Sequence, residues 1–149
     1  MEIKPRVTVI KVTKQDDLEI LFEIRRKVFV EEQRVSEKEE YDQYESIAFH
    51  YMACLNGVPV GTARWRKTDD GIKLERFAVL IDFRSAGIGS SLLKQILEDI
   101  GNQNTVLYLH AQITAIGLYK KFGFKEEGGM FKEAGILHYK MTRKPNYSL

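Results

Sequence analysis

The chain has 149 residues, which suits one domain spanning residues 1–149 and leaves little room for a second. Its 23 lysine and arginine residues and 21 aspartate and glutamate residues give a net charge of +2, too small to favour a nucleic-acid-binding protein. The single cysteine excludes an internal disulfide. The absence of a long apolar run or a leader-like segment predicts a cytoplasmic protein that does not associate with membranes.

The first part of the chain is predicted to form a strand, a long helix and a charged segment. Residues 6–12 alternate like a strand, which we place near a sheet edge. Thr13 then begins a capping-box-like start, and the helix that follows runs to about residue 33. Acidic side chains crowd residues 30–44, a pattern typical of a solvated helix or loop. The core stripe of the helix consists of Leu18, Leu21, Ile24 and Val28.

Residues 47–80 are predicted to form three consecutive antiparallel strands. Asn56-Gly57 between two alternating segments is a strong hairpin signal. Pro59 requires a bulge or an unpaired position early in the returning strand. Residues 69–71 form the second turn. Cys54 falls within the first of these strands, which favours a small buried side chain over a nucleophile.

The third strand leads through a glycine-containing loop into an amphipathic helix. Alternation along the strand puts Glu75, Phe77 and Val79 on one face. The loop, residues 84–90, joins the first amides of the helix, which attract anions because they have no partner within the helix. The P-loop pattern is absent, and Leu92 stands where a dinucleotide fingerprint needs its third glycine. We therefore expect a different anionic ligand.

The remaining elements complete a mixed α/β sheet. Residues 106–111 form a strand that is reached through a helix and should therefore run parallel to the strand before that helix. Thr114 is positioned to cap a short helix over residues 115–122. Residues 128–129, both glycine, are predicted to turn the chain into a last strand over residues 134–141.

Three blocks of the sequence carry a family resemblance. Arg84-x-x-Gly87-x-Gly89 resembles the acyl-CoA motif of the GNAT superfamily of N-acetyltransferases. Residues 112–124 are similar to a second GNAT motif, with Gln112 where many members have asparagine. The third block resembles the small bacterial ElaA-like branch. It comprises Arg25, Val28, Phe29, Glu32 and Gln33, together with Glu133, Ala134, Gly135, Ile136 and His138.

The resemblance implies a GNAT-like fold and an acetyl-CoA site. In this fold an antiparallel meander joins a splayed parallel strand pair, with helices on both faces. Acetyl-CoA enters as the acyl donor, and Gln112 lies beside it. Arg84 either contributes its charge to the phosphates or covers the loop. The implied binding residues are Phe77, Ala78 and Val79 for the pantetheine arm, and Arg84, Ser85, Ala86, Gly87, Ile88, Gly89 and Ser90 for the pyrophosphate.

The resemblance also implies transfer of an acetyl group to a primary amine. Tyr119 is the implied acid that protonates the leaving thiolate, and otherwise a core aromatic residue. The base is Glu75, His110 or water; the alternative roles are a cross-strand ion pair for Glu75 and a structural histidine for His110. The backbone amide of Val79 is the implied oxyanion donor. No metal is expected, because three scattered histidines and one cysteine lack metal-ligand spacing.

The partner is expected to be a small-molecule or peptide amine. In the resemblance the acidic residues 30–44 border the acceptor site, so their charge would favour a cationic amine. Nucleic acid and membranes are not expected partners, and a homodimer is allowed. A non-catalytic acyl-CoA sensor or regulatory module is the alternative function.

Overall fold

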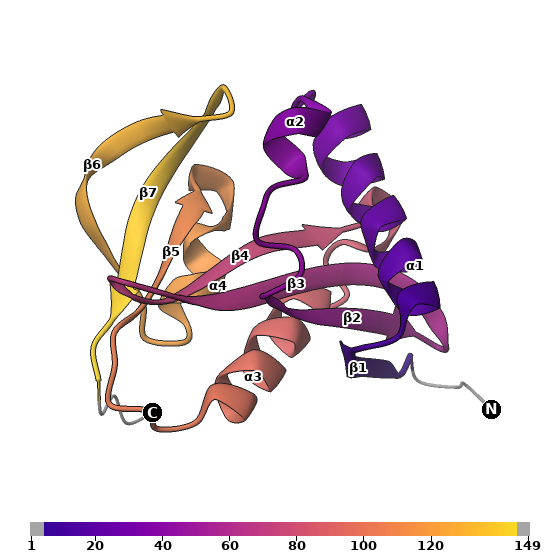
Figure 1. Ribbon diagram of the computed structural model, residues 1–149, viewed down its shortest axis with the longest axis horizontal. Helices are drawn as coiled ribbons and strands as arrows, with labels where there is room; N and C mark the ends of the chain where they lie inside the picture. The colour runs from indigo at the N-terminus through magenta and orange to yellow at the C-terminus, as the bar shows by residue number, and fades with distance from the viewer. Residues whose placement is uncertain (1–4, 146–149) are drawn as a thin grey trace.

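A seven-stranded mixed sheet forms the centre of the protein, whose computed structural model describes residues 5–145 (Figure 1). The strands lie in the order β1-β2-β3-β4-β5-β7-β6, which confirms the predicted mixed α/β fold. The strands are β1 (Val7–Val12), β2 (Phe49–Leu55), β3 (Val58–Thr68), β4 (Gly71–Val79), β5 (Leu107–Gln112), β6 (Lys125–Glu133) and β7 (Ile136–Arg143). The helical segments are α1 (Gln15–Arg25), the π-helix η1 (Arg26–Glu32), α2 (Glu37–Glu40), the 3-10 turns η2 (Ile81–Phe83) and η3 (Ile113–Ala115), α3 (Ile88–Ile100) and α4 (Ile116–Lys120).

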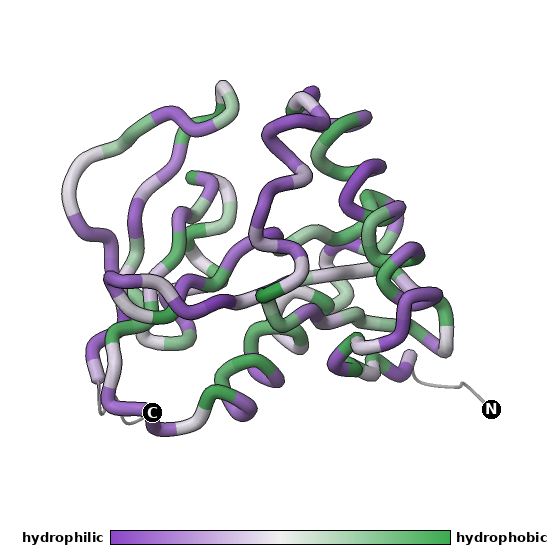
Figure 2. The backbone as a smooth tube through the Cα atoms, viewed as in Figure 1, coloured by the Kyte–Doolittle hydropathy of each residue, from purple (hydrophilic) through white to green (hydrophobic). Residues whose placement is uncertain are grey.

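Helices cover both faces of the sheet, as predicted. α3 buries Leu92, Leu93 and Ile96 in the main core against one face, and the tube in Figure 2 shows hydrophobic stretches of this helix interrupted by hydrophilic ones. On the other face η1 packs Phe29 against Ala78 of β4. Figure 1 shows α1 and α3 on opposite sides of the central strands. The two helical layers therefore fix β4 from both faces.

The first helix departs from the prediction at both ends. Lys14, rather than Thr13, is its N-cap, and no side chain caps it. The last turns are π-helical, with the Gln33 amide donating to the Val28 carbonyl oxygen at 3.0 Å, five residues back. The wider turn brings Val28 and Phe29 against the sheet beside the pocket described below.

The three-strand meander follows the turn residues seen in the sequence. Asn56 and Gly57 both have positive φ, 51° and 83°, as a two-residue hairpin loop requires. The register between β2 and β3 shifts between Ala53 and Cys54, with Val60 as the extra residue directly after Pro59, which confirms the bulge expected early in this strand. Local turn chemistry therefore explains the β2–β3 hairpin.

The parallel strands β4 and β5 pair over a short distance only. Ile72 lies opposite Leu107 and Lys73 opposite Tyr108, and no further pair joins the two strands. Beyond these residues β4 continues to Val79 without β5 beside it. This confirms the splayed parallel pair, and it leaves a wedge in the sheet.

A bulge interrupts β4 at the start of this wedge. Its register with β3 shifts between Thr62 and Arg64. Arg76 takes the extra position, with a left-handed φ of 59°. An extra residue in a strand reverses the alternation of side chains beyond it.

The bulge makes the predicted face of Glu75 wrong. Leu74 lies in the core under α3 together with Phe77 and Val79, whereas Ala78 lies in the cluster around η1. Glu75 follows Leu74 directly and so points to the face opposite Phe77 and Val79. Strict alternation assumes unbroken pairing, and the bulge is set by long-range register rather than by neighbouring residues.

The C-terminal hairpin also corrects the sequence analysis. Residues 128–129 lie inside β6 rather than in a turn. The turn is formed by Ala134 and Gly135, whose φ values are 52° and 77°. β7 therefore starts at Ile136, and it pairs with β5 as well as with β6. Thr114 lies in η3 and does not cap α4.

Two buried arginines anchor the acidic segment to the rest of the fold. The side chains of Arg25 and Arg64 are each 1% exposed. Arg25 pairs with Glu40 at 2.5 Å and with Glu45 at 2.8 Å. Arg64 pairs with Asp42 at 2.6 Å and also with Glu45. The solvated interpretation is therefore wrong for these carboxylates, because tertiary partners 15 to 22 residues away in the chain pair with them.

The pKa of Asp42 reflects this pairing. Burial alone would raise it, but hydrogen bonds from Arg64 and from the Tyr44 amide, with the charges of Arg64 and Arg76, lower the pKa to about 2. The stabilisation from this carboxylate is thus present at neutral pH. It is lost as the pH falls from the ordinary value of 3.8 through about 2.

Replacing Arg64 with methionine should strongly destabilise the fold, because three carboxylates, including Asp42 and Glu45, lose a buried cationic partner. We expect a loss of about 3–5 kcal/mol in the free energy of unfolding, measured by urea titration. Arg26→Met is the matched control, since Arg26 pairs with Glu23 on the surface and should cost less than about 1 kcal/mol. Equal losses in the two variants would contradict the anchoring role.

Candidate active site

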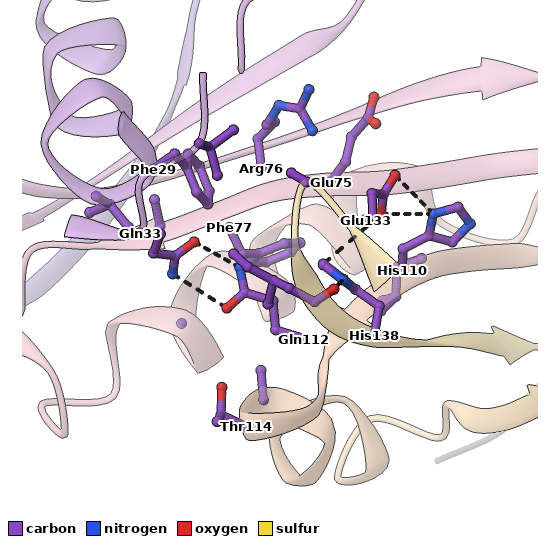
Figure 3. A pocket seen from close by; sticks show the side chains of 18 of the residues that line it. Phe29, Gln33, Glu75, Arg76, Phe77, His110, Gln112, Thr114, Glu133 and His138 are labelled. Carbon is purple, nitrogen blue, oxygen red and sulfur yellow. Dashed lines mark hydrogen bonds and ion pairs between the residues drawn. The ribbon is translucent and has the colours of Figure 1, made fainter. Parts of the chain in front are cut away.

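A pocket of about 610 Å³ lies where β4 and β5 separate (Figure 3). β4 contributes residues 73–79 to its wall, and η1 adds Phe29. Across the pocket are His110 and Gln112 of β5 and Tyr119 of α4. The tip of the β6–β7 hairpin closes a further side. The pocket is therefore built by strands that diverge rather than by long loops.

The backbone of Val79 is directed into the wedge. The Leu80 amide donates to the Val60 carbonyl oxygen at 2.9 Å, so this residue pair is bonded across β3 and β4. Neighbouring residues of an antiparallel strand direct their backbone groups to opposite edges, which turns those of Val79 away from β3. Its carbonyl oxygen there accepts from Arg84 Nε at 3.0 Å. The Val79 amide consequently faces the pocket with no β5 strand beside it.

The loop before α3 presents amides at the same side of the pocket. Ser85 and Gly87 both have left-handed φ values, 71° and 78°, and Gly87 is the N-cap of α3. The Ser91 amide bonds the Gly87 carbonyl oxygen, and the amides before it begin the helix without intrahelical acceptors. Gly89 lines the pocket, and no acidic side chain occupies the first turn. This arrangement favours an anion.

The Arg84 side chain forms hydrogen bonds within the protein. Its two terminal nitrogens each donate to Glu32 at 2.6 Å, and its Nε donates to Val79. The side chain thus ties the end of η1 to the end of β4. Of the two roles predicted for Arg84, this geometry favours the one in which it covers the loop.

Tyr119 is buried and contributes to the pocket wall. Its ring packs edge-on against Phe77, with centroids 5.5 Å apart, and against Phe124. The hydroxyl has no hydrogen bond to any residue in the described range 5–145. Burial raises the pKa of Tyr119, so the hydroxyl keeps its proton at neutral pH. The hydroxyl therefore carries a proton that it could donate into the cavity, although the raised pKa makes it a weaker acid than an exposed tyrosine.

Glu75 is surrounded by cations. Its Oε1 accepts from Arg64 Nε at 3.1 Å and Arg66 Nε at 2.6 Å, and its Oε2 lies 3.6 Å from Lys73 Nζ. The side chain is 7% exposed. Both carboxylate oxygens therefore have cationic partners, which leaves Glu75 poorly placed to accept a proton from a substrate. The geometry matches the cross-strand ion pair that was the alternative to the base.

His110 lies near a carboxylate that the sequence analysis did not single out for chemistry. Its Nδ1 is 3.2 Å from Glu133 Oε2 (Figure 3). The hydrogen bond from His110 is the main reason that the pKa of Glu133 is lowered. Glu133 entered the sequence analysis only within the branch resemblance, because the pairing of β6 was not predicted. The only local signal for Glu133 in the sequence is its place as an acidic residue directly before the Ala134-Gly135 turn.

Gln112 is paired across the wedge. Its Nε2 donates to Gln33 Oε1 at 2.9 Å, and Gln33 Nε2 donates back at 3.3 Å. Figure 3 shows this reciprocal amide pair beside Phe77. The link joins the C-terminal end of η1 to the end of β5, so it spans the opening of the wedge.

Other candidate sites are not supported within residues 5–145. No group of three potential ligands in this range is arranged for a metal ion. His50 is buried away from the pocket and bonds the Glu45 carbonyl oxygen through Nε2 at 2.8 Å. Burial raises the pKa of the Cys54 thiol, which suppresses the reactive thiolate. None of the helices in the described range is long and apolar enough to cross a membrane.

Comparisons with known proteins agree with this geometry. The family model described as an acetyltransferase (GNAT) domain matches residues 11–145. The Bacillus subtilis protein YjcF, named as an uncharacterized N-acetyltransferase, is 36% identical over 131 residues, covering 87% of this chain and 94% of that protein. Escherichia coli ElaA is 25% identical with a TM-score of 0.80, covering 95% of this chain and all of that one. A GNAT acetyltransferase from Elizabethkingia anophelis, solved with acetyl-CoA bound, has a TM-score of 0.68 at 20% identity, covering 93% of this chain and 97% of its own.

Proposed function

The chain belongs to the GNAT family of acetyltransferases, and from this premise we propose that it moves an acetyl group from acetyl-CoA to a primary amine by direct attack in a ternary complex. The observation that carries the proposal is the free backbone edge of β4 at Val79. It lies in a pocket that also contains the Tyr119 hydroxyl and the start of α3. An acyl thioester needs an oxyanion donor, an acid and a phosphate site, and these three features supply them.

Binding of acetyl-CoA follows from the orientation of the backbone. The backbone groups of Phe77 and Val79 that β5 leaves unpaired would bond the pantetheine arm, whereas those of Ala78, which lies opposite Thr62, are directed to β3. Residues 84–90 would hold the pyrophosphate through their amides, with Arg84 bracing the loop through Glu32. Gln112 would have to release Gln33, or rotate with it, to contact the donor.

The reaction requires balanced proton transfer. A C–N bond forms and the C–S bond breaks, so the ammonium loses two protons overall. One passes to a base and then to solvent, and the other balances the proton that Tyr119 gives to the thiolate. The Val79 amide would stabilise the negative charge on the thioester oxygen.

We assign the base to His110 rather than to Glu75. Both line the pocket, but the Glu75 carboxylate bonds two arginines and lies near a lysine. The imidazole of His110 has one carboxylate partner and, among residues 5–145, no hydrogen bond at Nε2. A neutral imidazole with a free nitrogen can accept a proton near neutral pH.

An acceptor screen tests the proposal as a whole. Thiol release from acetyl-CoA would be followed with polyamines, aminosugars, amino acids, aminoglycoside antibiotics and peptide amino termini. Release with at least one amine supports the enzyme. Tight acetyl-CoA binding without release from any of them would favour the alternative, a non-catalytic acyl-CoA sensor. The cytoplasmic location and a homodimer stay predictions.

The phosphate site is tested by Gly89→Asp, with Gly89→Asn as a neutral control of the same size. A Cβ at this position would lie 3.2 Å from the flexible end of Leu118, so both variants should fold. We expect the aspartate to bind acetyl-CoA at least about tenfold more weakly than the asparagine, or about 1.4 kcal/mol, by calorimetric titration. Equal affinities would argue against phosphate binding at this loop.

Tyr119→Phe should bind acetyl-CoA nearly as well as the wild type yet turn over about ten- to a thousandfold more slowly. The ring keeps its packing against Phe77, and only the proton donor is lost. The deficit should shrink with an acyl donor whose thiol is more acidic, measured in single turnovers. Tyr51→Phe removes a core hydroxyl outside the pocket and should leave turnover of the folded protein unchanged. The same deficit with both donors would return Tyr119 to a packing role.

His110→Gln should slow turnover about a hundredfold at neutral pH and recover as the pH rises and free amine accumulates. Glu75→Gln should lower the free energy of unfolding, because the partners of the carboxylate, including Arg64, lose its charge, but the shape of the pH–rate profile should persist. Steady-state kinetics of both folded variants across pH provide the comparison. The opposite pattern would assign the base to Glu75.

A further inference from the structure

Glu133 ends β6 at the tip of the C-terminal hairpin and faces several basic groups. His110 Nδ1 of β5 lies 3.2 Å from its Oε2, and His138 Nε2 of β7 lies 4.0 Å away. Lys73 of β4 adds a positive charge, which also lowers the pKa of Glu133. All four residues line the pocket, and Figure 3 labels three of them, Glu133, His110 and His138. The hairpin thus brings the Glu133 carboxylate next to the imidazole of His110, which we assign as the base.

The hydrogen bond determines which nitrogen of His110 carries the proton. With its lowered pKa, Glu133 is ionised at neutral pH and can only accept. Nδ1 must therefore donate. A neutral imidazole carries one proton, so Nε2 keeps its lone pair and is the nitrogen able to take a proton.

Packing holds the pair in place. The ring of Phe131, on the same strand as Glu133, lies edge-on to His110 with centroids 5.1 Å apart. Phe131 also stacks on His138, at 5.8 Å and 22°. His138 in turn donates from Nδ1 to the Ile136 carbonyl oxygen at 2.7 Å. The Phe131 ring thereby holds the Glu133 end of β6 against His110 and His138.

We propose that Glu133 is a positioning residue for catalysis, which holds His110 as the Nδ1–H tautomer and stabilises the imidazolium formed when Nε2 accepts the proton of the acceptor ammonium. The proton moves from the ammonium nitrogen to Nε2, and the Nδ1 proton stays on the imidazole. The positive charge that appears on the ring lies beside the negative carboxylate of Glu133. This role rests on the proposed function, in which His110 is the base.

Nitrogen-15 NMR of the imidazoles tests the tautomer without any turnover. At a pH where the three imidazoles are neutral, His110 and His138 should be Nδ1–H and His50 should be Nε2–H, according to their acceptors. In Glu133→Ala we expect His110 to become Nε2–H, with His50 and His138 unchanged as internal references. An Nε2–H tautomer of His110 in the wild type, or no change in the variant, would overturn the proposal.

A double-mutant cycle tests the catalytic consequence. Glu133→Gln should lower kcat about ten- to hundredfold with an unchanged KM for acetyl-CoA, and it should have little further effect in the His110→Gln background. Glu127→Gln, on the same strand and paired with Lys140 on the surface, should behave like the wild type. Equal losses from Glu133→Gln in both backgrounds would assign Glu133 a merely structural role.

The proposed acetyltransferase activity and the positioning role of Glu133 can be tested separately. If the wild type released no thiol with any amine, the proposed function would fail, while the NMR measurement would still decide whether Glu133 orients His110. If turnover were normal and Glu133→Gln had no effect, the acetyltransferase would stand and the positioning role would not. The side chain of Glu133 is 48% exposed, so its substitution should not threaten folding.

Discussion

The early end of pairing between β4 and β5 is the constraint on which the rest of the structure depends. A strand edge without a partner leaves amides and carbonyl groups that must find other bonds. Here β3 pairs with one edge of β4 almost to its end, and β7 occupies the far edge of β5. The unpaired groups are thus confined to the wedge. The unpaired backbone groups of β4 line the pocket there, so the backbone itself forms part of the binding surface.

The bulge in β4 connects this wedge to the buried ion network. Arg76, the extra residue, donates to the backbone carbonyl oxygens of Glu39 and Glu40 and to the Asp42 carboxylate. Arg64 of β3 also binds this acidic segment, because its terminal nitrogens donate to the Asp42 carboxylate. The bulge therefore places Arg76 where it can hold the acidic segment beside the pocket. The segment carries many negative charges, but much of that charge is neutralised inside the protein, which weakens the case for acidic attraction of a cationic amine.

Two carboxylates beside one pocket have different environments. Glu75 is nearly buried among Arg64, Arg66 and Lys73, so its charge balances a permanent cationic cluster. Glu133 is half exposed, and its closest partner is the imidazole of His110, a side chain that can take up and release a proton. Glu75 therefore stabilises the structure, whereas Glu133 can respond when a proton moves onto His110.

The sequence by itself determined the elements whose signals are local. The Asn56-Gly57 turn, the apolar stripe of α3 and the glycine loop before it were predicted because turn chemistry and periodicity act between neighbouring residues. Only the tertiary structure decided the bulge at Arg76, the face of Glu75 and the partner of His110. Each depends on register or contact between distant segments; His110 and Glu133 are 23 residues apart in the chain. Strand alternation contains no information about where pairing slips, and a residue type does not identify the charge that will face it after folding.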